Sequence, residues 1–272
     1  RTGLHLPAAS GVSAMILDVD GVAFTYRSIP VIRDVTFSLQ SHQVLAILGP
    51  NGVGKTTLLK CMNAILKPKA GSVLVEGTDL LAADRMEVAR KVGYVPQRCE
   101  AGRMTVFDAV LLGRRPHIGW SVTERDIRIV EAAIRRLRLE DLSLRYIDEM
   151  SGGELQKVSI ARALVQEPRV LLLDEPTSSL DLRNQLEILG IVRRVAADHN
   201  VAAVMTMHDL NMALRYADRF ILLKDGIIHA AGGPEVVTPE SIKAVYGVSV
   251  AVERYNGYRI VVPLAPENPD NV

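Results

Sequence analysis

The chain has 272 residues, 48% of them hydrophobic, and a formal net charge of +1. This length and apolar content suit one sizeable domain or two closely packed lobes around a buried core. The small net charge argues against a nucleic-acid-binding surface, which needs a marked basic excess. Apolar runs stop short of the ~20 residues that cross a bilayer, so we expect any membrane link to go through a partner. Cys61 and Cys99 have no metal-ligand spacing, which favours a reduced, cytosolic protein.

Residues 1–14 have neither clear periodicity nor a charge pattern, and we predict a disordered leader that is not part of the fold. Residues 16–39 are predicted to form strands broken by a turn near residues 27–30, because apolar and polar residues alternate there. Further elements follow in chain order: a strand at 73–75, a helix at 84–91 and a strand at 92–97.

A glycine-rich turn lies between an apolar run at residues 44–48 and a helical pattern at residues 58–62. Strand, glycine-rich turn and helix in this order predict a phosphate-binding loop, in which backbone N–H groups converge on phosphate oxygens. Lys55 would reach the β- and γ-phosphates, and the Thr56 hydroxyl would bind Mg²⁺. An ordinary βα turn is the alternative, but the Lys-Thr pair favours a nucleoside triphosphate site. The predicted loop comprises Gly49, Pro50, Asn51, Gly52, Val53, Gly54, Lys55, Thr56 and Thr57.

The composition changes after Gln97, where residues 105–113 and 123–139 both predict helices. In the second helix, Thr123 with Asp126 suggests a capping start, and an apolar face is formed by Ile127, Val130, Ile134 and Leu137. The other face is crowded with arginines, which suits a solvated surface or a docking patch: Arg125, Arg128, Arg135, Arg136 and Arg138. We predict a helical insert between two halves of an α/β core.

The core returns at residues 170–173, an apolar run that ends in Asp174 and Glu175. A buried parallel strand has this pattern, with its carboxylates at the edge of the sheet where ligands bind. Asp174 suits Mg²⁺ coordination, and Glu175 could orient or deprotonate a water. Upstream, Ser151, Gly152 and Gly153 precede a helical pattern at residues 155–166 and form a second candidate anion site. Two phosphate-recognising elements in one chain predict a composite site.

Over roughly residues 15–262 the chain resembles the nucleotide-binding subunit of an ATP-binding cassette (ABC) transporter. The matching motifs are Walker A at 49–57, the Q-loop glutamine Gln97, the signature at 150–154, Walker B at 170–174, the D-loop at 179–181, the switch histidine His208 and the A-loop tyrosine Tyr26. Taken alone, Tyr26, Gln97 and His208 would each suit an ordinary structural role. The resemblance implies that Tyr26 stacks on adenine, and that Glu175, His208 and Gln97 are catalytic.

The resemblance also implies the ligands of each site and the fold. Thr56, Gln97 and Asp174 are expected to bind Mg²⁺, and Asp181 to be the D-loop acid. Ser151, Gly152, Gly153 and Glu154 would act in trans on the ATP of a second copy. The expected fold is α/β, a P-loop NTPase (RecA-like) core with an N-terminal antiparallel β-subdomain and an inserted α-helical subdomain. The expected divisions are the β-subdomain with the first half of the ATP-binding core at 15–97, the helical subdomain at 98–165, the second half of the core at 166–247, and a β-hairpin with a tail at 248–272.

Two residues depart from the family pattern: Glu154 stands where glutamine is usual, and Met150 where leucine is usual. Similar Ser-Gly-Gly-Glu signatures occur in importers of iron chelates and cobalamin, so the glutamate is expected to be tolerated. The role of the Glu154 carboxylate itself stays open at this point.

The family implies a head-to-tail homodimer that binds ATP and Mg²⁺ and works with two membrane permease subunits, indirectly with a substrate-binding protein, and with no nucleic acid. Its expected place is the cytoplasmic face of a prokaryotic membrane, as a peripheral subunit. The tail predicts strands at 248–253 and 258–262 around an Asn256-Gly257 turn. Such a hairpin could simply cover a sheet edge, which is compatible with the family resemblance.

This tail resembles that of importers for iron-siderophore, haem or cobalamin. An oxyanion importer, for example of molybdate, and a soluble non-transport ABC ATPase are the alternatives. The groove that receives the permease is expected near residues 97–113. A bulky charge at Met104 or Val106 is therefore expected to uncouple ATPase activity from transport without unfolding the chain.

Overall fold

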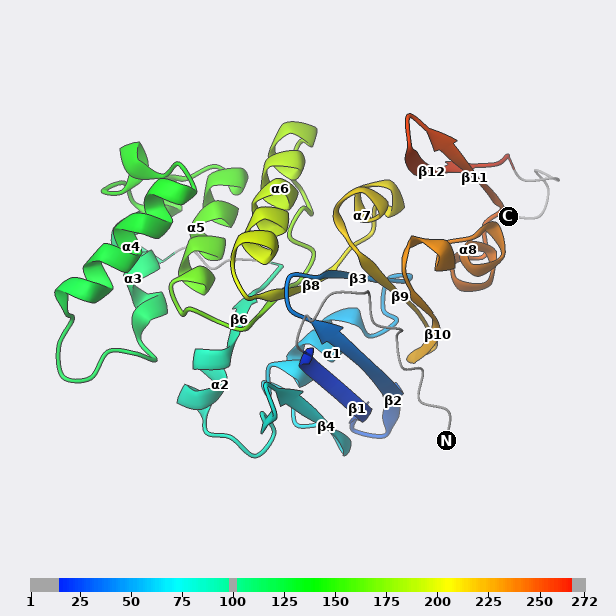
Figure 1. Ribbon diagram of the computed structural model, residues 1–272, viewed down its shortest axis with the longest axis horizontal. Helices are drawn as coiled ribbons and strands as arrows, with labels where there is room; N and C mark the ends of the chain where they lie inside the picture. Colours follow the sequence, from blue (N-terminus) through cyan, green and yellow to red (C-terminus); the bar gives the residue numbers. More distant parts are fainter. Residues whose placement is uncertain (1–14, 98–101, 266–272) are drawn as a thin grey trace.

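The computed structural model describes residues 15–97 and 102–265. The predicted leader at residues 1–14, Cys99 and the end of the predicted tail lie outside the described residues. Within this part of the chain the strands form a four-stranded sheet, a six-stranded sheet and a separate two-stranded hairpin. Figure 1 shows the six-stranded sheet between the antiparallel strands of the N-terminal region and the helices α5, α6 and α7.

The six-stranded central sheet has the order β10-β9-β3-β8-β7-β6. Its strands are β3 (Val44–Leu48), β6 (Val92–Val95), β7 (Val170–Leu173), β8 (Ala202–Thr206), β9 (Arg219–Lys224) and β10 (Ile227–Gly232). All neighbouring pairs are parallel except β9 with β10. The carboxyl ends of β3, β8 and β7 therefore meet at one edge of the sheet, which is where open α/β sheets bind their ligands.

The antiparallel sheet has the order β2-β1-β4-β5 and confirms the predicted β-rich lobe. Its strands are β1 (Met15–Tyr26), β2 (Ile29–Gln40), β4 (Ala70–Val75) and β5 (Thr78–Asp79). In β2, Val35, Phe37 and Leu39 are buried while the residues between them are partly exposed. This period of two turns one face of the sheet toward the core.

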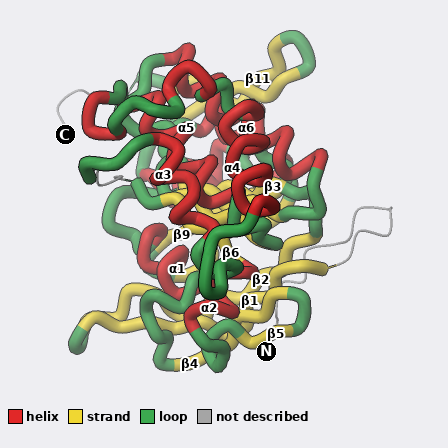
Figure 2. The backbone as a smooth tube through the Cα atoms, turned by 90° about the vertical axis from the view of Figure 1, so that its left-hand side faces the viewer, coloured by secondary structure: helices red, strands yellow, loops and turns green. Residues whose placement is uncertain are grey.

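The helices are α1 (Lys55–Met62), α2 (Arg85–Lys91), α3 (Val106–Leu111), α4 (Glu124–Arg136), α5 (Gly152–Leu164), α6 (Leu182–Asp198), α7 (Leu210–Tyr216) and α8 (Pro239–Tyr246). Short 3₁₀ turns lie at η1 (Leu112–Arg114), η2 (Glu140–Leu142), η3 (Ile147–Glu149) and η4 (Pro234–Val236). Figures 1 and 2 both place α3, α4 and α5 together, away from the antiparallel strands. Among the described helices, none combines the length and the apolar character needed to cross a membrane.

Two apolar layers hold the central sheet, one on each face. Alternate residues of the same strand enter different layers: Val44 and Ala46 pack with α5 and α6, whereas Leu45 and Ile47 pack with α1 and the antiparallel sheet. These strands are buried on both faces, which explains why their sequences are nearly continuous apolar runs. Each fully buried leucine or isoleucine side chain contributes roughly 1.5–3 kcal/mol.

Helix α4 follows most of its predicted pattern. Thr123 and Asp126 form the predicted capping box, and Val130 and Ile134 are buried. Two details of the prediction are wrong. Ile127 is 38% exposed because it lies toward the edge of the apolar face, and the helix ends at Arg136 because Arg138 has a left-handed backbone with φ of 56°.

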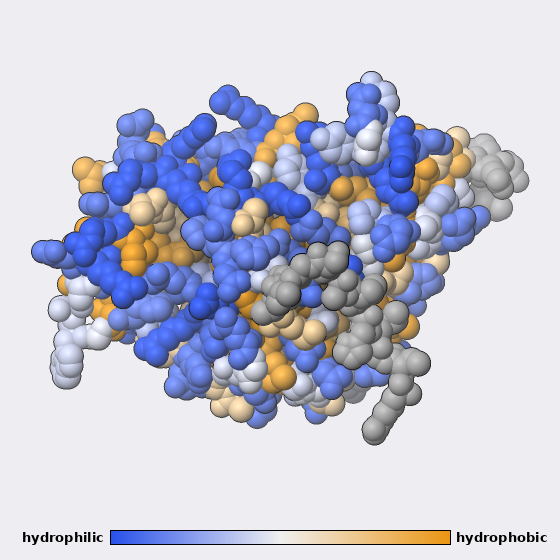
Figure 3. Space-filling view, in the orientation of Figure 1, coloured by the Kyte–Doolittle hydropathy of each residue, from blue (hydrophilic) through white to orange (hydrophobic). Residues whose placement is uncertain are grey.

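The arginine-rich face of α4 is mostly paired with acids. Arg128 contacts Glu124 at 3.4 Å, and Arg136 contacts Asp198 at 2.7 Å. Hydrophilic side chains also cover much of the face in view in Figure 3. Exposed ion pairs such as these contribute little to stability, about 0–1 kcal/mol each. We therefore interpret the arginine-rich face of α4 as a solvated surface.

The C-terminal hairpin forms as predicted, with strands β11 (Val250–Tyr255) and β12 (Tyr258–Pro263). Asn256 and Gly257 both have positive φ, 49° and 83°, as a tight hairpin turn requires. Within the described ranges the hairpin forms a sheet of its own and packs on α7 and α8. Its main contacts are with these helices, and cover of a sheet edge stays a prediction. The Asn211 amide fixes β12 to α7 by bonding both the N–H and the C=O of Val261.

Candidate active site at the carboxyl edge of the central sheet

The turn between β3 and α1 has a backbone that only glycine adopts readily. Gly52 and Gly54 have φ of 79° and 110°. A Cβ at Gly54 would lie 2.7 Å from the Ile32 side chain, so the loop lies directly against β2. In the part of the chain that the structure describes, no side-chain hydrogen bond caps the N-terminus of α1. The free N–H groups and the positive end of the helix dipole make this turn a ready anion site.

Lys55 is buried, with only 5% of the residue exposed, and its ammonium lies over this turn. It donates hydrogen bonds to the carbonyls of Gly49 at 2.8 Å and Pro50 at 3.1 Å. Burial lowers the pKa of Lys55, while the carboxylates of Glu175 and Asp174 act in the opposite direction. The lysine thus places a buried positive charge beside the anion site and near two acids.

Asp174 follows β7 directly and is buried. Its Oδ1 accepts hydrogen bonds from the hydroxyls of Thr56 at 3.0 Å and Thr206 at 2.9 Å. These three residues come from the ends of neighbouring strands and from the first turn of α1. The donor set consists of a carboxylate and a hydroxyl, which are hard oxygen ligands of the type that Mg²⁺ prefers.

Glu175 lies one residue farther out and joins the remaining candidates. Gln97 donates a hydrogen bond through Nε2 to Glu175 Oε2, and His208 Nε2 contacts Glu175 Oε1. The backbone N–H of Glu175 donates to Thr206 Oγ1 at 2.8 Å. Glu175 has a positive φ of 47°. Non-glycine residues in this region carry backbone strain, which is often found at functional sites.

Tyr26 ends β1 and its side chain is 46% exposed. It packs edge-on against Phe24, with 4.8 Å between the ring centroids. Tyr26 pairs with Ile29 in the hairpin whose second strand carries Ile32, the residue that touches Gly54. The exposed ring therefore lies at the end of the hairpin that borders the phosphate loop.

The signature residues open α5, three residues earlier than the helix predicted from periodicity. Ser151 is the N-cap, and its N–H and hydroxyl both donate to Glu154 Oε2, at 2.9 and 2.6 Å. The Ser151 hydroxyl accepts in return from the Glu154 N–H. This capping box gives Glu154 a role that was open from sequence: its carboxylate stabilises the start of its own helix.

This role predicts the order of stability of two Glu154 variants. Glu154→Ala is expected to lower the free energy of unfolding by roughly 0.3–1.5 kcal/mol, and Glu154→Gln by less, because glutamine can also close a capping box. The measurement is urea unfolding at neutral pH. Equal stabilities of all three chains would contradict the capping role.

Glu154 also predicts a pH dependence. Hydrogen bonds from the Ser151 hydroxyl and backbone N–H lower the pKa of Glu154 in the folded chain. Its carboxylate therefore contributes stability that is complete above the unfolded-state pKa and lost as pH falls through the folded-state pKa. The difference in the free energy of unfolding between the unchanged chain and Glu154→Gln should become smaller as the pH is lowered. A difference that is independent of pH would contradict this assignment.

The signature lies beside the D-loop and the first turn of α6, since a Cβ at Gly152 would lie 3.7 Å from the Leu180 side chain. A Cβ at Gly153 would lie 2.8 Å from Asn184 Cγ, and Asn184 is bonded through its N–H and its amide to Asp181. Among the described residues, Ser151 and Glu154 make their side-chain hydrogen bonds with each other. One chain thus carries two separate candidate anion sites.

The structure brings together Lys55, Thr56, Asp174, Glu175, Gln97 and His208. Within the described part of the chain, no hydrogen bond joins residues 151–154 to this group. Sequence reasoning missed Thr206, which connects Asp174 and Glu175. A hydroxyl at the end of an apolar strand, two residues before His208, is the signal that could have identified it.

Comparisons with known proteins agree with this arrangement. The family model described as ABC transporter matches residues 32–178. An uncharacterised ABC transporter ATP-binding protein of Methanocaldococcus jannaschii is 57% identical over 253 residues, which cover 93% of this chain and 100% of that protein. A hemin import ATP-binding protein of Pseudomonas entomophila is 40% identical over 256 residues, covering 91% of this chain and 99% of that protein.

Solved structures support the same conclusion. A chain of an inward-facing, metal-chelate type ABC transporter matches with a TM-score of 0.81 and 30% identity, over 93% of this chain and 98% of that one. A dimeric ATP-binding cassette bound to ADP and inorganic phosphate matches with a TM-score of 0.72 and 26% identity, over 80% and 99% of the two chains. The predicted P-loop NTPase fold is confirmed. The chain belongs to the ABC transporter family, as an ATP-binding subunit with the ATPase activity that drives transport.

Proposed function

We propose that this chain powers an ABC importer for a metal chelate, such as an iron-siderophore complex, haem or cobalamin. The observation that carries the proposal is the match over nearly the full length to the hemin import subunit and to the metal-chelate type transporter. A probable siderophore transport ATP-binding protein of Bacillus subtilis, 35% identical over 89% of both chains, supports it further. Import of an oxyanion such as molybdate is the alternative.

The proposed ATP site is composite and forms between two copies arranged head to tail. The contacts of the signature support this, because no hydrogen bond among the described residues joins it to the phosphate loop of its own chain. ABC cassettes crystallise as dimers, including one with ADP and inorganic phosphate. In a symmetric dimer each phosphate loop would face the partner's signature, and Ser151 would contact the γ-phosphate in trans.

In this site the phosphate loop and Lys55 would bind the phosphates, and Tyr26 would stack on adenine. Thr56 and Asp174 fit Mg²⁺ as oxygen donors, with Gln97 as a further ligand once it leaves Glu175. The metal would neutralise charge on the phosphate oxygens. Few protein ligands suffice here, because Mg²⁺ keeps several waters.

Glu175 is the proposed general base. Its carboxylate would orient the attacking water and accept a proton from it as the bond between the γ-phosphorus and the bridging oxygen breaks. The contacts with Gln97 and His208 hold this carboxylate at the sheet edge, and Thr206 fixes its backbone. His208 would then donate a hydrogen bond to the γ-phosphate.

The proposed docking site for the permease is a cleft of about 550 Å³ on the helical region, whose lining includes Met86, Met104, Leu111, Leu112 and Ile118. It lies within and beside the predicted range of residues 97–113. The apolar lining with a few charged residues suits a short amphipathic helix of a membrane partner.

A substitution of Met104 tests whether the cleft is the docking site for the permease. It is partly exposed and lines the cleft, so Met104→Arg is expected to leave the fold and the ATPase activity of the isolated chain intact. In reconstituted vesicles this variant should lose most chelate uptake, because the charge would prevent permease docking. Normal uptake by the variant would contradict the docking site.

The corresponding prediction for Val106 is wrong. Val106 is fully buried in the core at the start of α3. A charge there would be desolvated without a partner, so the variant is expected to unfold rather than to uncouple.

Two experiments test the proposed function. Co-purification with an intrinsic membrane protein separates a transporter subunit from a soluble ABC ATPase. Vesicles that contain the chain and its permease should take up a ferric siderophore, haem or cobalamin in an ATP-dependent manner. Uptake of sugars or amino acids alone would refute the substrate class, and uptake of molybdate alone would favour the oxyanion alternative.

A further inference from the structure

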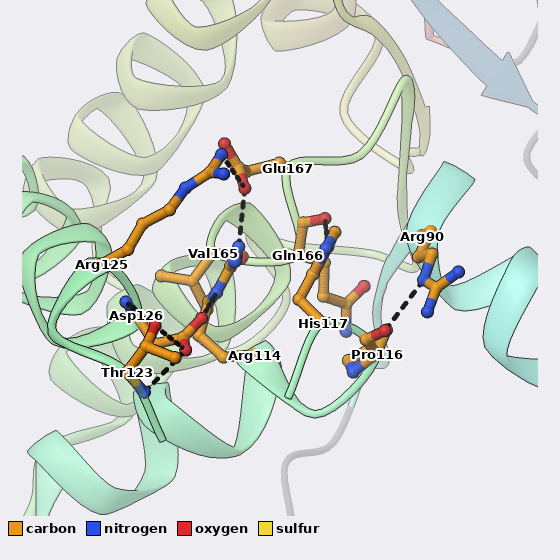
Figure 4. Close-up of polar contacts among 10 residues, drawn as sticks. All are labelled: Arg90, Arg114, Pro116, His117, Thr123, Arg125, Asp126, Val165, Gln166 and Glu167. Atoms are coloured by element: carbon orange, nitrogen blue, oxygen red, sulfur yellow. Dashed lines mark hydrogen bonds and ion pairs between the residues drawn. The ribbon is translucent and has the colours of Figure 1, made fainter. Parts of the chain in front are cut away.

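Residues 112–118 pack against the C-terminal end of α5, the helix that begins at the signature. We call this segment the strap. The strap runs from η1 toward the start of α4 (Figure 4). A Cβ at Gly113 would lie 2.1 Å from the carbonyl oxygen of Arg162 and 2.6 Å from the Val165 side chain. The strap backbone therefore lies directly on the last turn of α5, at a distance that only glycine permits.

Arg114 holds the end of α5 from within the strap. Its side chain is buried, and Nη1 donates to the carbonyl of Val165 at 2.6 Å and to Glu167 Oε2 at 2.8 Å. Val165 is the C-cap of α5. A cation at this position bonds a carbonyl that the helix end leaves free, and it also complements the negative end of the helix dipole.

The charge of Arg114 is balanced by the buried Asp126, which lies 2.9 Å from Nε. Hydrogen bonds from the Thr123 hydroxyl and N–H, together with Arg114, lower the pKa of Asp126 to about 2. The N-terminus of α4 and the C-terminus of α5 are thus joined through one buried guanidinium, as Figure 4 shows.

The strap is also fixed to the ATP-binding core. The Pro116 carbonyl accepts a hydrogen bond from Arg90 Nε, on α2, at 2.8 Å. His117 Nε2 is 2.8 Å from the carbonyl oxygen of Gln166. Residues 165–167 are therefore held by the strap at three consecutive positions, and α2 holds the strap in turn.

The position of residues 165–167 also affects the N-terminal end of α5, where the signature lies. The helix has 13 residues, so at 1.5 Å per residue its ends lie about 20 Å apart, with Ser151 at its start. The chain after Glu167 leads directly to β7 and Asp174. A small tilt at residues 165–167 would thus move the signature relative to the core.

We propose that Gly113 and Arg114 are positioning residues that set the orientation of α5, and with it the signature half-site presented to a second copy of the chain. The inference rests on the proposed composite site. It predicts that a substitution in the strap impairs hydrolysis at the ATP site that contains the partner's phosphate loop. The phosphate loop of the substituted chain itself should still bind ATP.

The main variant is Gly113→Ala, and its matched control is Gly119→Ala, where an added Cβ meets none of the described residues within 4 Å. Gly113→Ala should lower the steady-state ATPase activity of the full chain about tenfold or more, because misplacement of a catalytic group by ~1 Å has effects of this order. ATP affinity measured directly should change less than about twofold, since the phosphate loop is untouched. Activity equal to that of Gly119→Ala would overturn the inference.

A second pair of variants, with smaller expected effects on folding, keeps the inference testable if Gly113→Ala does not fold. Arg90→Ala removes the bond to Pro116 from an exposed position, and Arg85→Ala is the control on the same helix. Arg90→Ala should reduce ATPase activity and Arg90→Lys should restore part of it. If Gly113→Ala does not fold, equal activity of Arg90→Ala and Arg85→Ala overturns the inference.

Each proposed ATP site has two halves, the signature of one chain and the phosphate loop of the other. Mixing experiments show which of these halves the strap affects. Gly113→Ala mixed with an equal amount of Lys55→Ala should recover up to about a quarter of the unchanged activity, because half of the randomly formed dimers are mixed and each has one intact site. Gly113→Ala mixed with Ser151→Arg should recover none. The reverse pattern would overturn the inference.

The control mixture is Lys55→Ala with Ser151→Arg, which contains no strap variant. Recovery there, without recovery in the mixture of Gly113→Ala with Lys55→Ala, would overturn the strap inference and leave the composite site standing. No recovery in the control mixture would refute the composite site and the inference with it.

Discussion

Glu175→Gln is expected to bind ATP as the unchanged chain does and to hydrolyse it ~10²–10⁴-fold more slowly. Glutamine has nearly the same shape as glutamate but cannot accept a proton from the attacking water. The phosphate loop and Lys55 are unchanged, so nucleotide affinity should persist. The backbone of residue 175 is held by Thr206, whose bond does not involve the side chain.

The measurement is steady-state ATPase activity together with direct ATP binding on the same preparation. Glu124→Gln, the same change at an exposed position on α4, serves as the matched control and should retain full activity. Near-normal hydrolysis by Glu175→Gln would show that another group activates the water.

Ser151→Arg and Lys55→Ala are each expected to abolish ATPase activity alone and to restore part of it when mixed. Lys55→Ala removes a charge-assisted contact worth roughly 1.5–3 kcal/mol to bound phosphate. Ser151→Arg leaves the phosphate loop intact and disrupts the signature that faces the partner. A mixed dimer would join the intact loop of one chain to the intact signature of the other.

The control for this mixture is Lys55→Ala with Glu175→Gln. Both changes fall in the same half-site, so no mixed dimer contains a complete ATP site and no activity should return. Recovery in this control, or none in the mixture with Ser151→Arg, would mean that the two anion sites do not act across a dimer.

The phosphate loop and the carboxylates after β7 could be predicted because their signals are local. A glycine pattern between an apolar strand and a helix fixes the backbone of the turn, and a buried strand that ends in acids exposes them at the sheet edge. The fold was implied by the family resemblance that these motifs carry.

Other features depend on contacts between distant segments. The hydroxyl at the end of β8 singles out Thr206 in the sequence, but its contacts with Asp174 and Glu175 depend on β8 lying beside β7, which the sequence of β8 does not reveal. Gly113 is required by the backbone of α5, some fifty residues away in the chain, as its contact with Arg162 shows. The burial of Val106 could not be predicted, because a helix start near a predicted groove does not reveal whether its first side chain turns inward.

The central claim is that ATP binds between two copies of this chain. Light scattering of Glu175→Gln with ATP and Mg²⁺ tests it most directly, because slow hydrolysis should trap the closed state. We expect the mass of two chains with ATP and of one chain without it, and addition of Ser151→Arg to the same chain should abolish the dimer. A monomer at saturating ATP would contradict the composite site.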